Sequence, residues 1–145
     1  MNAKKVGIFN LIFLHKKSLF LLTNLLIFFM VPLAEAWNKG TVALVMKALS
    51  NPFFLKMEEG ARKYAREENV PLEVFGVERE TDVERQVGIV ENLISRGYGA
   101  IVIAPADSKR LVQICKKALE KNIAVVNIDN PLHKGTMDQL GISIP

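Results

Sequence analysis

Four short apolar runs, each followed by a polar or amphipathic segment, constrain the fold of this chain more than any other feature. The runs cover residues 41–47, 71–77, 100–103 and 123–128. Each is apolar almost throughout rather than alternately apolar and polar, which is typical of strands buried on both faces of a parallel sheet. The repeated order of strand and helix, with short connections, predicts an α/β fold: a parallel sheet with helices on both faces.

The segments between the runs carry helix start signals and one apolar face each. Asn51 can cap the first helix, with Pro52 in its first turn, where the missing N–H of proline costs nothing. Asp82 can cap the second helix, and Asp107 or Ser108 the third. The side chains expected to face the core are Phe54, Met57, Ala61 and Tyr64, then Val83, Val87, Val90 and Ile94, then Leu111, Cys115 and Ala118.

Residues 1–36 are interpreted as a targeting segment with an apolar signal helix. Four lysines precede the apolar stretch 18–32, and Ala34-Glu35-Ala36 follows it as an A-x-A cleavage pattern. We expect export to the periplasm or cell exterior, cleavage after Ala36, and a mature domain of residues 37–145. The alternative is an uncleaved membrane anchor, although the stretch is shorter than the ~20 apolar residues that span a bilayer.

The distribution of charge bears on possible partners. The whole chain has 19 basic and 15 acidic residues, but four of the lysines and only one acid lie in the first 36 residues. The remainder is nearly neutral, whereas nucleic-acid binding needs basic side chains clustered on a folded face. We therefore expect no nucleic-acid partner. The membrane would be contacted only through the N-terminal segment, if that segment stays uncleaved.

No motif for catalysis is found in the sequence. It contains no G-x-S-x-G elbow, no H-E-x-x-H pair and no glycine-rich phosphate loop. Cys115, the single cysteine, falls on a predicted buried helix face, and His133 is expected to be a solvated loop residue. We predict a protein that is not an enzyme and that needs no cofactor and no metal.

The residues that follow the first predicted strand are candidates for ligand binding, because ligands of parallel sheets bind beyond the carboxyl ends of the strands. Lys47, Asn51, Phe53 and Phe54 lie there. Adjacent helical residues point about 100° apart, so at least one of the two rings should overhang the sheet. An aromatic face beside polar groups suits a sugar, although both rings could instead close the end of the core.

Polar residues also follow two other predicted strands. Asp129 and Asn130 come directly after the fourth, and a carboxylate at that point is poorly explained by packing. It could accept hydrogen bonds from two ligand hydroxyls, or it could simply form a turn. Arg79 lies in the loop after the second strand, where it either overhangs a ligand cleft at the carboxyl ends of the strands or is solvated.

Two long stretches resemble a known family. They are VALVMKALSNPFFLKMEEGARKYA and IVIAPADSKRLVQICKKALEKNIAVVNIDN, and they resemble the N-terminal lobe of ribose-binding-protein-like periplasmic sugar-binding proteins of ABC transporters. The resemblance covers residues 41–130. It implies one Rossmann-like lobe of a two-lobed protein that closes on a sugar and delivers it to an ABC transporter permease. It also implies that Asn51, Phe53, Phe54 and Asp129 face the cleft.

Departures from the family pattern refine this expectation. Ribose binders have Arg where Asn130 stands and Asn where Ala104 stands, while some hexose binders have a lysine at the position of Lys47. These differences favour another pentose, a hexose or a polyol over ribose. Family members also have a second lobe, so we expect residues 37–145 to be an incomplete, truncated domain. The alternative function is a membrane-anchored sugar sensor for signalling.

Overall fold

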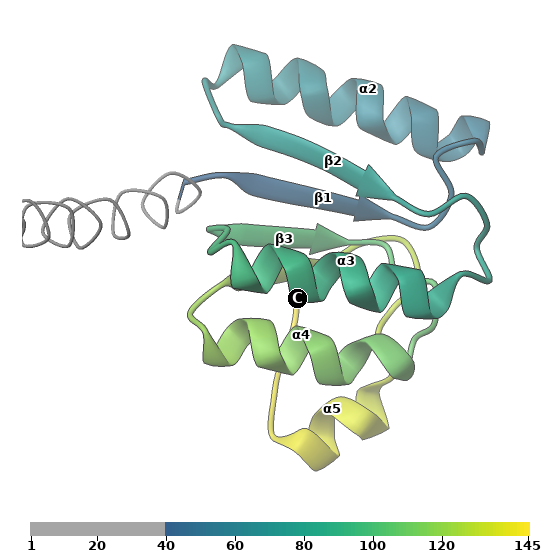
Figure 1. Ribbon diagram of the computed structural model, residues 1–145, viewed down its shortest axis with the longest axis vertical. Coiled ribbons are helices and arrows are strands. Elements are labelled where there is room, and N and C mark those ends of the chain that lie inside the picture. The colour runs from purple at the N-terminus through teal and green to yellow at the C-terminus, as the bar shows by residue number, and fades with distance from the viewer. Residues whose placement is uncertain (1–39) are drawn as a thin grey trace, which may run out of the picture. The chain divides into compact units, whose positions relative to one another are not determined.

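Four strands form one parallel sheet at the centre of the described domain. They are β1 (Val42–Met46), β2 (Leu72–Gly76), β3 (Ala100–Ile103) and β4 (Ala124–Asn127). Their order in the sheet is β2-β1-β3-β4, so β2 and β4 are the edge strands. Figure 1 shows β2, β1 and β3 side by side in this order. This computed structural model describes residues 40–145, and the predicted targeting segment lies outside the described residues.

Three helices connect the strands, and a fourth follows the last strand. They are α2 (Pro52–Glu67), α3 (Val83–Ser95), α4 (Arg110–Glu120) and α5 (Lys134–Leu140). α3 and α4 pack side by side on one face of the sheet, and α2 lies on the other (Figure 1). The predicted α/β architecture, with helices on both faces of a parallel sheet, is therefore confirmed. Within residues 40–145, no helix is both long enough and apolar enough to cross a bilayer.

The two faces of the sheet are buried unequally. The face under α3 and α4 carries the larger core, whereas on the α2 side Leu44 and Met46 pack with Phe54 in a smaller cluster. Val126 of β4 is 39% exposed, while its neighbour Val125, on the opposite face, is 4% exposed. Burial on both faces, which the apolar runs predict, holds for the central strand β1 and not for the edge strand β4.

The helix caps follow the sequence signals with one exception. The Asn51 side chain accepts a hydrogen bond from the backbone two residues later and caps α2. Asp107 Oδ1 accepts two backbone hydrogen bonds at the start of α4, at 2.8 and 2.6 Å. Asp82 stands at the cap position of α3 but makes no side-chain cap bond. Its carboxylate instead lies 3.3 Å from the Arg79 guanidinium, so the prediction of a capping bond is wrong there.

The buried helix faces are partly rotated from the predicted ones. Tyr64 is 63% exposed, and its neighbour Ala65 is buried in its place. Ala65 stands eleven positions after Phe54, just over three full turns, so the two share a face, and Tyr64 points about 100° away from Ala65. In α3, the fully buried residues include Gln86 and exclude Val87. The predicted face of α4 is confirmed, with Leu111, Cys115 and Ala118 all buried.

Candidate functional site

An ion pair connects the loops that follow β1 and β4 at the carboxyl edge of the sheet. Lys47 Nζ lies 2.7 Å from Asp129 Oδ2, and the two side chains are only 8% and 23% exposed. Because β3 lies between β1 and β4, this pair spans the end of β3. We call the carboxyl-edge residues Lys47, Asn51, Phe53, Asp129 and Asn130 the rim.

The two adjacent phenylalanines have different environments. Phe54 is 2% exposed and packs among the apolar residues at the end of β1, whereas Phe53 is 57% exposed. Their rings meet edge to face, with centroids 5.2 Å apart. Lys47 Nζ lies 5.7 Å from the centroid of the Phe54 ring. The structure thus buries Phe54 beside the ion pair inside the lobe and leaves the Phe53 ring open to solvent.

Asn51 is tied to the loop that follows β2 as well as to its own helix. Its Oδ1 caps α2, and its Nδ2 donates a hydrogen bond of 3.4 Å to Glu80 Oε1. Arg79, in that same loop, is 79% exposed and pairs with Asp82. Two strands separate the loop after β2 from the loop after β4. The structure therefore brings Asn51 to the rim and does not bring Arg79 to Asp129.

The loop that carries Asp129 and Asn130 is held by a residue that the sequence reading missed. Asn127, the last residue of β4, donates from Nδ2 to the Asn130 carbonyl at 2.9 Å and accepts at Oδ1 from the Leu132 N–H at 2.7 Å. Asp129 itself has φ of 63°, in the left-handed region. Such a backbone costs a non-glycine residue of the order of 1 kcal/mol and is least unfavourable for Asn and Asp. The only signal in the sequence is an amide that ends an apolar strand.

A buried amide on α3 holds the loop after β3. Gln86 on α3 is fully buried, and both polar atoms of its side chain bond to the segment that follows β3. The predicted apolar face of α3 does not include this position. It was missed because a glutamine inside a helical pattern is ordinarily a solvated residue.

Other candidates from the sequence have structural roles. His133 is exposed and lies in the loop directly before α5, as predicted, and its Nδ1 also caps that helix by accepting from the Thr136 N–H at 3.1 Å. Burial raises the pKa of the Cys115 thiol to about 12, which keeps it protonated and unreactive, as predicted. Among residues 40–145, no three acidic, histidine or cysteine side chains are grouped as a metal site would require.

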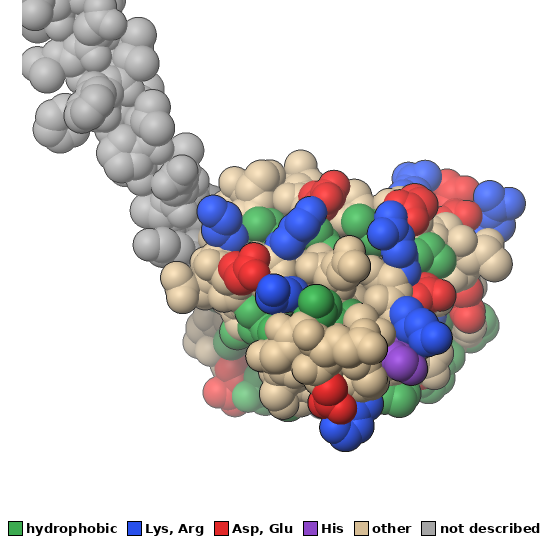
Figure 2. Space-filling model, turned by 90° about the horizontal axis from the view of Figure 1, so that it is seen from below, with side chains coloured by type: hydrophobic (Ala, Val, Ile, Leu, Met, Phe, Trp, Pro, Cys, Tyr) green, Lys and Arg blue, Asp and Glu red, His purple; other side chains and the backbone are tan. Residues whose placement is uncertain are grey.

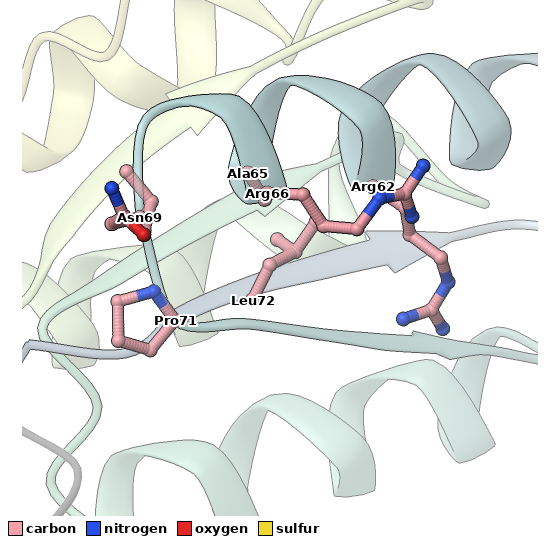
Figure 3. Close-up of a pocket in the computed structure, with 7 residues that line it drawn as sticks. Arg62, Ala65, Arg66, Asn69, Pro71 and Leu72 are labelled. Atoms are coloured by element: carbon pink, nitrogen blue, oxygen red, sulfur yellow. The ribbon is translucent and has the colours of Figure 1, made fainter.

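A groove of about 620 Å³ lies away from the rim, between the end of α2 and the start of β2. Figure 3 shows it, with Arg62, Arg66 and Asn69 beside Pro71 and Leu72. Because Leu72 opens β2, this groove belongs to the amino edge of the sheet, opposite the rim. Elsewhere, on the face seen in Figure 2, acidic and basic side chains are interspersed rather than separated by sign.

Comparisons with known proteins match this architecture. Residues 42–142 match the model of the periplasmic binding protein domain family. A D-ribose/D-allose-binding protein of Pseudomonas aeruginosa is 47% identical over 114 residues, covering 77% of this chain and 36% of that protein. The chain thus spans about a third of the length of this curated relative.

Two solved structures are also similar. An ABC transporter solute-binding protein from Burkholderia multivorans is 45% identical with a TM-score of 0.70, covering 74% of this chain and 38% of that one. A periplasmic solute-binding protein of an ABC transporter from Actinobacillus succinogenes, with bound D-allose, is 33% identical with a TM-score of 0.70, covering 73% and 37%. From its sequence, its sheet order and these matches, the chain belongs to the periplasmic binding protein domain family.

Proposed function

We propose that this chain is a sugar-contacting lobe of an extracytoplasmic solute-binding protein, which delivers a monosaccharide or polyol to an ABC transporter permease. The observation that carries the proposal is the Lys47–Asp129 pair at the carboxyl edge, next to the Phe54 ring, against which the exposed Phe53 ring packs edge to face. The relatives named for ribose and allose binding, and the D-allose complex, support the same class of ligand.

The rim has the chemistry that a polyhydroxylated ligand requires. A hydroxyl can donate to the Asp129 carboxylate while it or its neighbour accepts from the Lys47 ammonium, and such charge-assisted hydrogen bonds are roughly twice as strong as neutral ones. The Phe53 ring offers an apolar face for the C–H side of a sugar ring. The Asn51 and Asn130 side chains supply further donors and acceptors at the same edge, and Phe54 supports the pair from inside the lobe.

Binding rather than catalysis is the function that these residues support. The rim combines one ion pair, two amides and an exposed ring, and it contains no hydroxyl, thiol or imidazole side chain. The relatives reported above are sugar-binding transport proteins, which fits a non-enzymatic role. No observation on the described residues favours the signalling alternative.

Export is part of the proposal. We infer that residues 1–36 are a signal peptide removed after Ala36, which places residues 37–145 in the periplasm. N-terminal sequencing of exported material should then give Trp37 as the first residue. An intact Met1 on exported protein would instead support a retained anchor.

The ligand class can be tested with the 145-residue chain in solution. Saturation-transfer NMR detects weak binding, which is what one lobe should give because it supplies only part of the contacts. D-allose, D-ribose, D-fucose, D-glucose and myo-inositol make a suitable panel. At least one should give a signal that Asp129→Asn abolishes and Asp138→Asn, the same change on exposed α5, preserves. Silence across the whole panel would overturn the proposed function.

A further inference from the structure

Gln86 is a fully buried polar side chain whose bonds all lead to the rim side of the domain. Nε2 donates to the Ala104 carbonyl at 2.9 Å, and Oε1 accepts from the Ala106 N–H at 2.8 Å. The other fully buried positions of α3, Val90 and Leu93, are apolar. A buried amide without partners is costly, so the two bonds fix both the side chain and the backbone segment that it grips.

The segment that Gln86 grips connects the two halves of the rim. On the β1 side, the Ala104 N–H donates to the Val45 carbonyl at 2.9 Å. On the β4 side, the carbonyl of Ser108 accepts from the His133 N–H at 2.9 Å. Residues 104–108 therefore bond to the β1 side at one end and to the loop after β4 at the other, so we expect a shift of this segment to act on both halves of the rim.

We propose that Gln86 is a positioning residue for ligand binding: it fixes the loop after β3 and thereby sets the spacing across which Lys47 and Asp129 meet. That the ligand is a sugar rests on the proposed function, whereas the positioning argument rests on the hydrogen bonds and the ion pair described above. Lys47 and Asp129 lie within hydrogen-bond distance of each other across the end of β3, at 2.7 Å. A shift of an ångström would separate them and misalign both for the hydroxyls of a sugar.

The substitution Gln86→Glu gives a sharp test, because its protonation state decides whether the contact survives. A protonated carboxylic acid can donate to the Ala104 carbonyl and accept from the Ala106 N–H, as the amide does. An ionised carboxylate loses the donor and directs negative charge at that carbonyl. Burial raises the pKa of a carboxyl group, so the switch should fall between about pH 5 and pH 8.

Charged groups near Gln86 are common to the wild type and the variant. Glu84 and Arg110 form a two-bond pair between α3 and α4, and Asp82 and Asp107 stand at the starts of the same helices. Their hydrogen bonds lower the pKa values of Glu84 and Asp107, so both stay ionised in this pH range. The wild-type chain measured at both pH values therefore corrects for them.

The experiment measures the dissociation constant of the best-binding sugar at pH 5 and pH 8 by NMR titration of the 145-residue chain. We expect Gln86→Glu to match the wild type at pH 5 and to bind about tenfold more weakly at pH 8, the cost of one buried hydrogen bond. Gln86→Leu should bind weakly at both. Gln113→Glu, the same change on an exposed position of α4, should bind normally at both.

The backbone chemical shifts of Ala104, Ser108 and Asp129 give a readout that needs no sugar. In Gln86→Glu they should move between pH 5 and pH 8 by more than in the wild type. Folded Gln86→Glu with unchanged affinity and wild-type shifts at both pH values would overturn the positioning role. If no sugar binds the wild type, the proposed function fails, and these shifts alone decide whether Gln86 positions the loop.

Discussion

The two edges of the sheet hold their polar residues in different ways. At the amino edge, Asn69, Asn122 and Gly97 adopt positive φ in short turns, so the backbone conformation is satisfied locally. At the carboxyl edge, the polar side chains are held by partners from distant elements: Lys47 by Asp129, and the loop after β3 by Gln86. Apart from the bond between Tyr98 and Glu73, the amino edge reverses the chain with local turns, whereas the carboxyl edge holds its side chains and loops in place through contacts between distant elements.

The largest expected effect separates the two phenylalanines at the carboxyl edge. Phe54→Ala should lower the free energy of unfolding by about 3–5 kcal/mol, because it leaves a cavity among buried residues. Phe53→Ala should change stability by less than about 0.5 kcal/mol, since its ring is mostly exposed, while weakening sugar binding. Urea denaturation and sugar titration of both variants measure this contrast. Equal loss of stability would contradict the assignment of one ring to the core and one to the ligand.

The next effect compares ion pairs inside and outside the rim. Lys47→Met should cost about 2 kcal/mol, because it leaves the Asp129 carboxylate partly buried without its cation, although the exposure of Asp129 reduces the full penalty of a buried pair. Lys63→Met removes a cation from an exposed pair with Glu67, at 3.9 Å, and should cost less than about 0.5 kcal/mol. The midpoints of urea denaturation measure both costs, provided that the slopes of the transitions are the same as in the wild type. Similar costs for the two variants would remove the distinction between the rim and the surface.

A smaller effect concerns α4, the helix that follows the loop after β3. Asp107→Ala should lower the free energy of unfolding by about 1 kcal/mol through loss of the α4 cap. Backbone hydrogen bonds from Arg110 and Lys109 lower the pKa of Asp107 below the ordinary value of an aspartate. The stabilisation is therefore present above that value and lost as the pH falls through the folded-state pKa. Unfolding measured from pH 7 to pH 2 should show the difference in free energy of unfolding between wild type and variant shrinking towards the acid end. A difference that stays constant with pH would show that it does not come from the ionised Asp107 cap.

The smallest effect at neutral pH lies at the amino edge. The Tyr98 hydroxyl donates to Glu73 Oε2 at 2.7 Å, and burial together with this bond raises the pKa of Tyr98 to about 12. Tyr98→Phe should cost less than about 1 kcal/mol at pH 7, since Glu73 is half exposed. Between pH 10 and 12 the phenol ionises in the unfolded state first, so wild-type stability falls with rising pH more steeply than that of the variant. If the free energies of unfolding of wild type and Tyr98→Phe changed in parallel between pH 10 and 12, the raised pKa of Tyr98 would be contradicted.

Much of the fold could be predicted from the sequence because its signals are local. Continuous apolar runs mark the strands of a parallel sheet, and Asn51 and Asp107 mark helix starts in the residues themselves. The candidate residues Lys47, Asn51 and Asp129 could be named because the carboxyl ends of parallel strands share an edge. Helical spacing also placed Phe54 on the core face of α2, and its ring is 2% exposed, whereas the spacing left the environment of Phe53 open.

The residues that organise the rim could not be predicted. Gln86 and Asn127 are amides in otherwise apolar segments, and a periodic pattern assigns such residues to solvent or to a strand end. Their function depends on backbone groups of loops distant in the sequence, which no local pattern encodes. Tyr64 is the opposite case: its position near the apolar face of α2 predicted burial, but its side chain is 63% exposed. An aromatic residue beside an apolar face can still face water when its helix covers only part of a sheet.

Site-resolved NMR tests the central claim most directly. The ¹⁵N-labelled chain would be titrated with the sugar that gives the strongest saturation-transfer signal. The largest amide shifts are expected at Lys47, Asn51, Phe53, Asp129 and Asn130, with the groove at Arg62 and Arg66 unaffected. Shifts that centre on that groove, or that spare the rim while the sugar binds, would contradict the account.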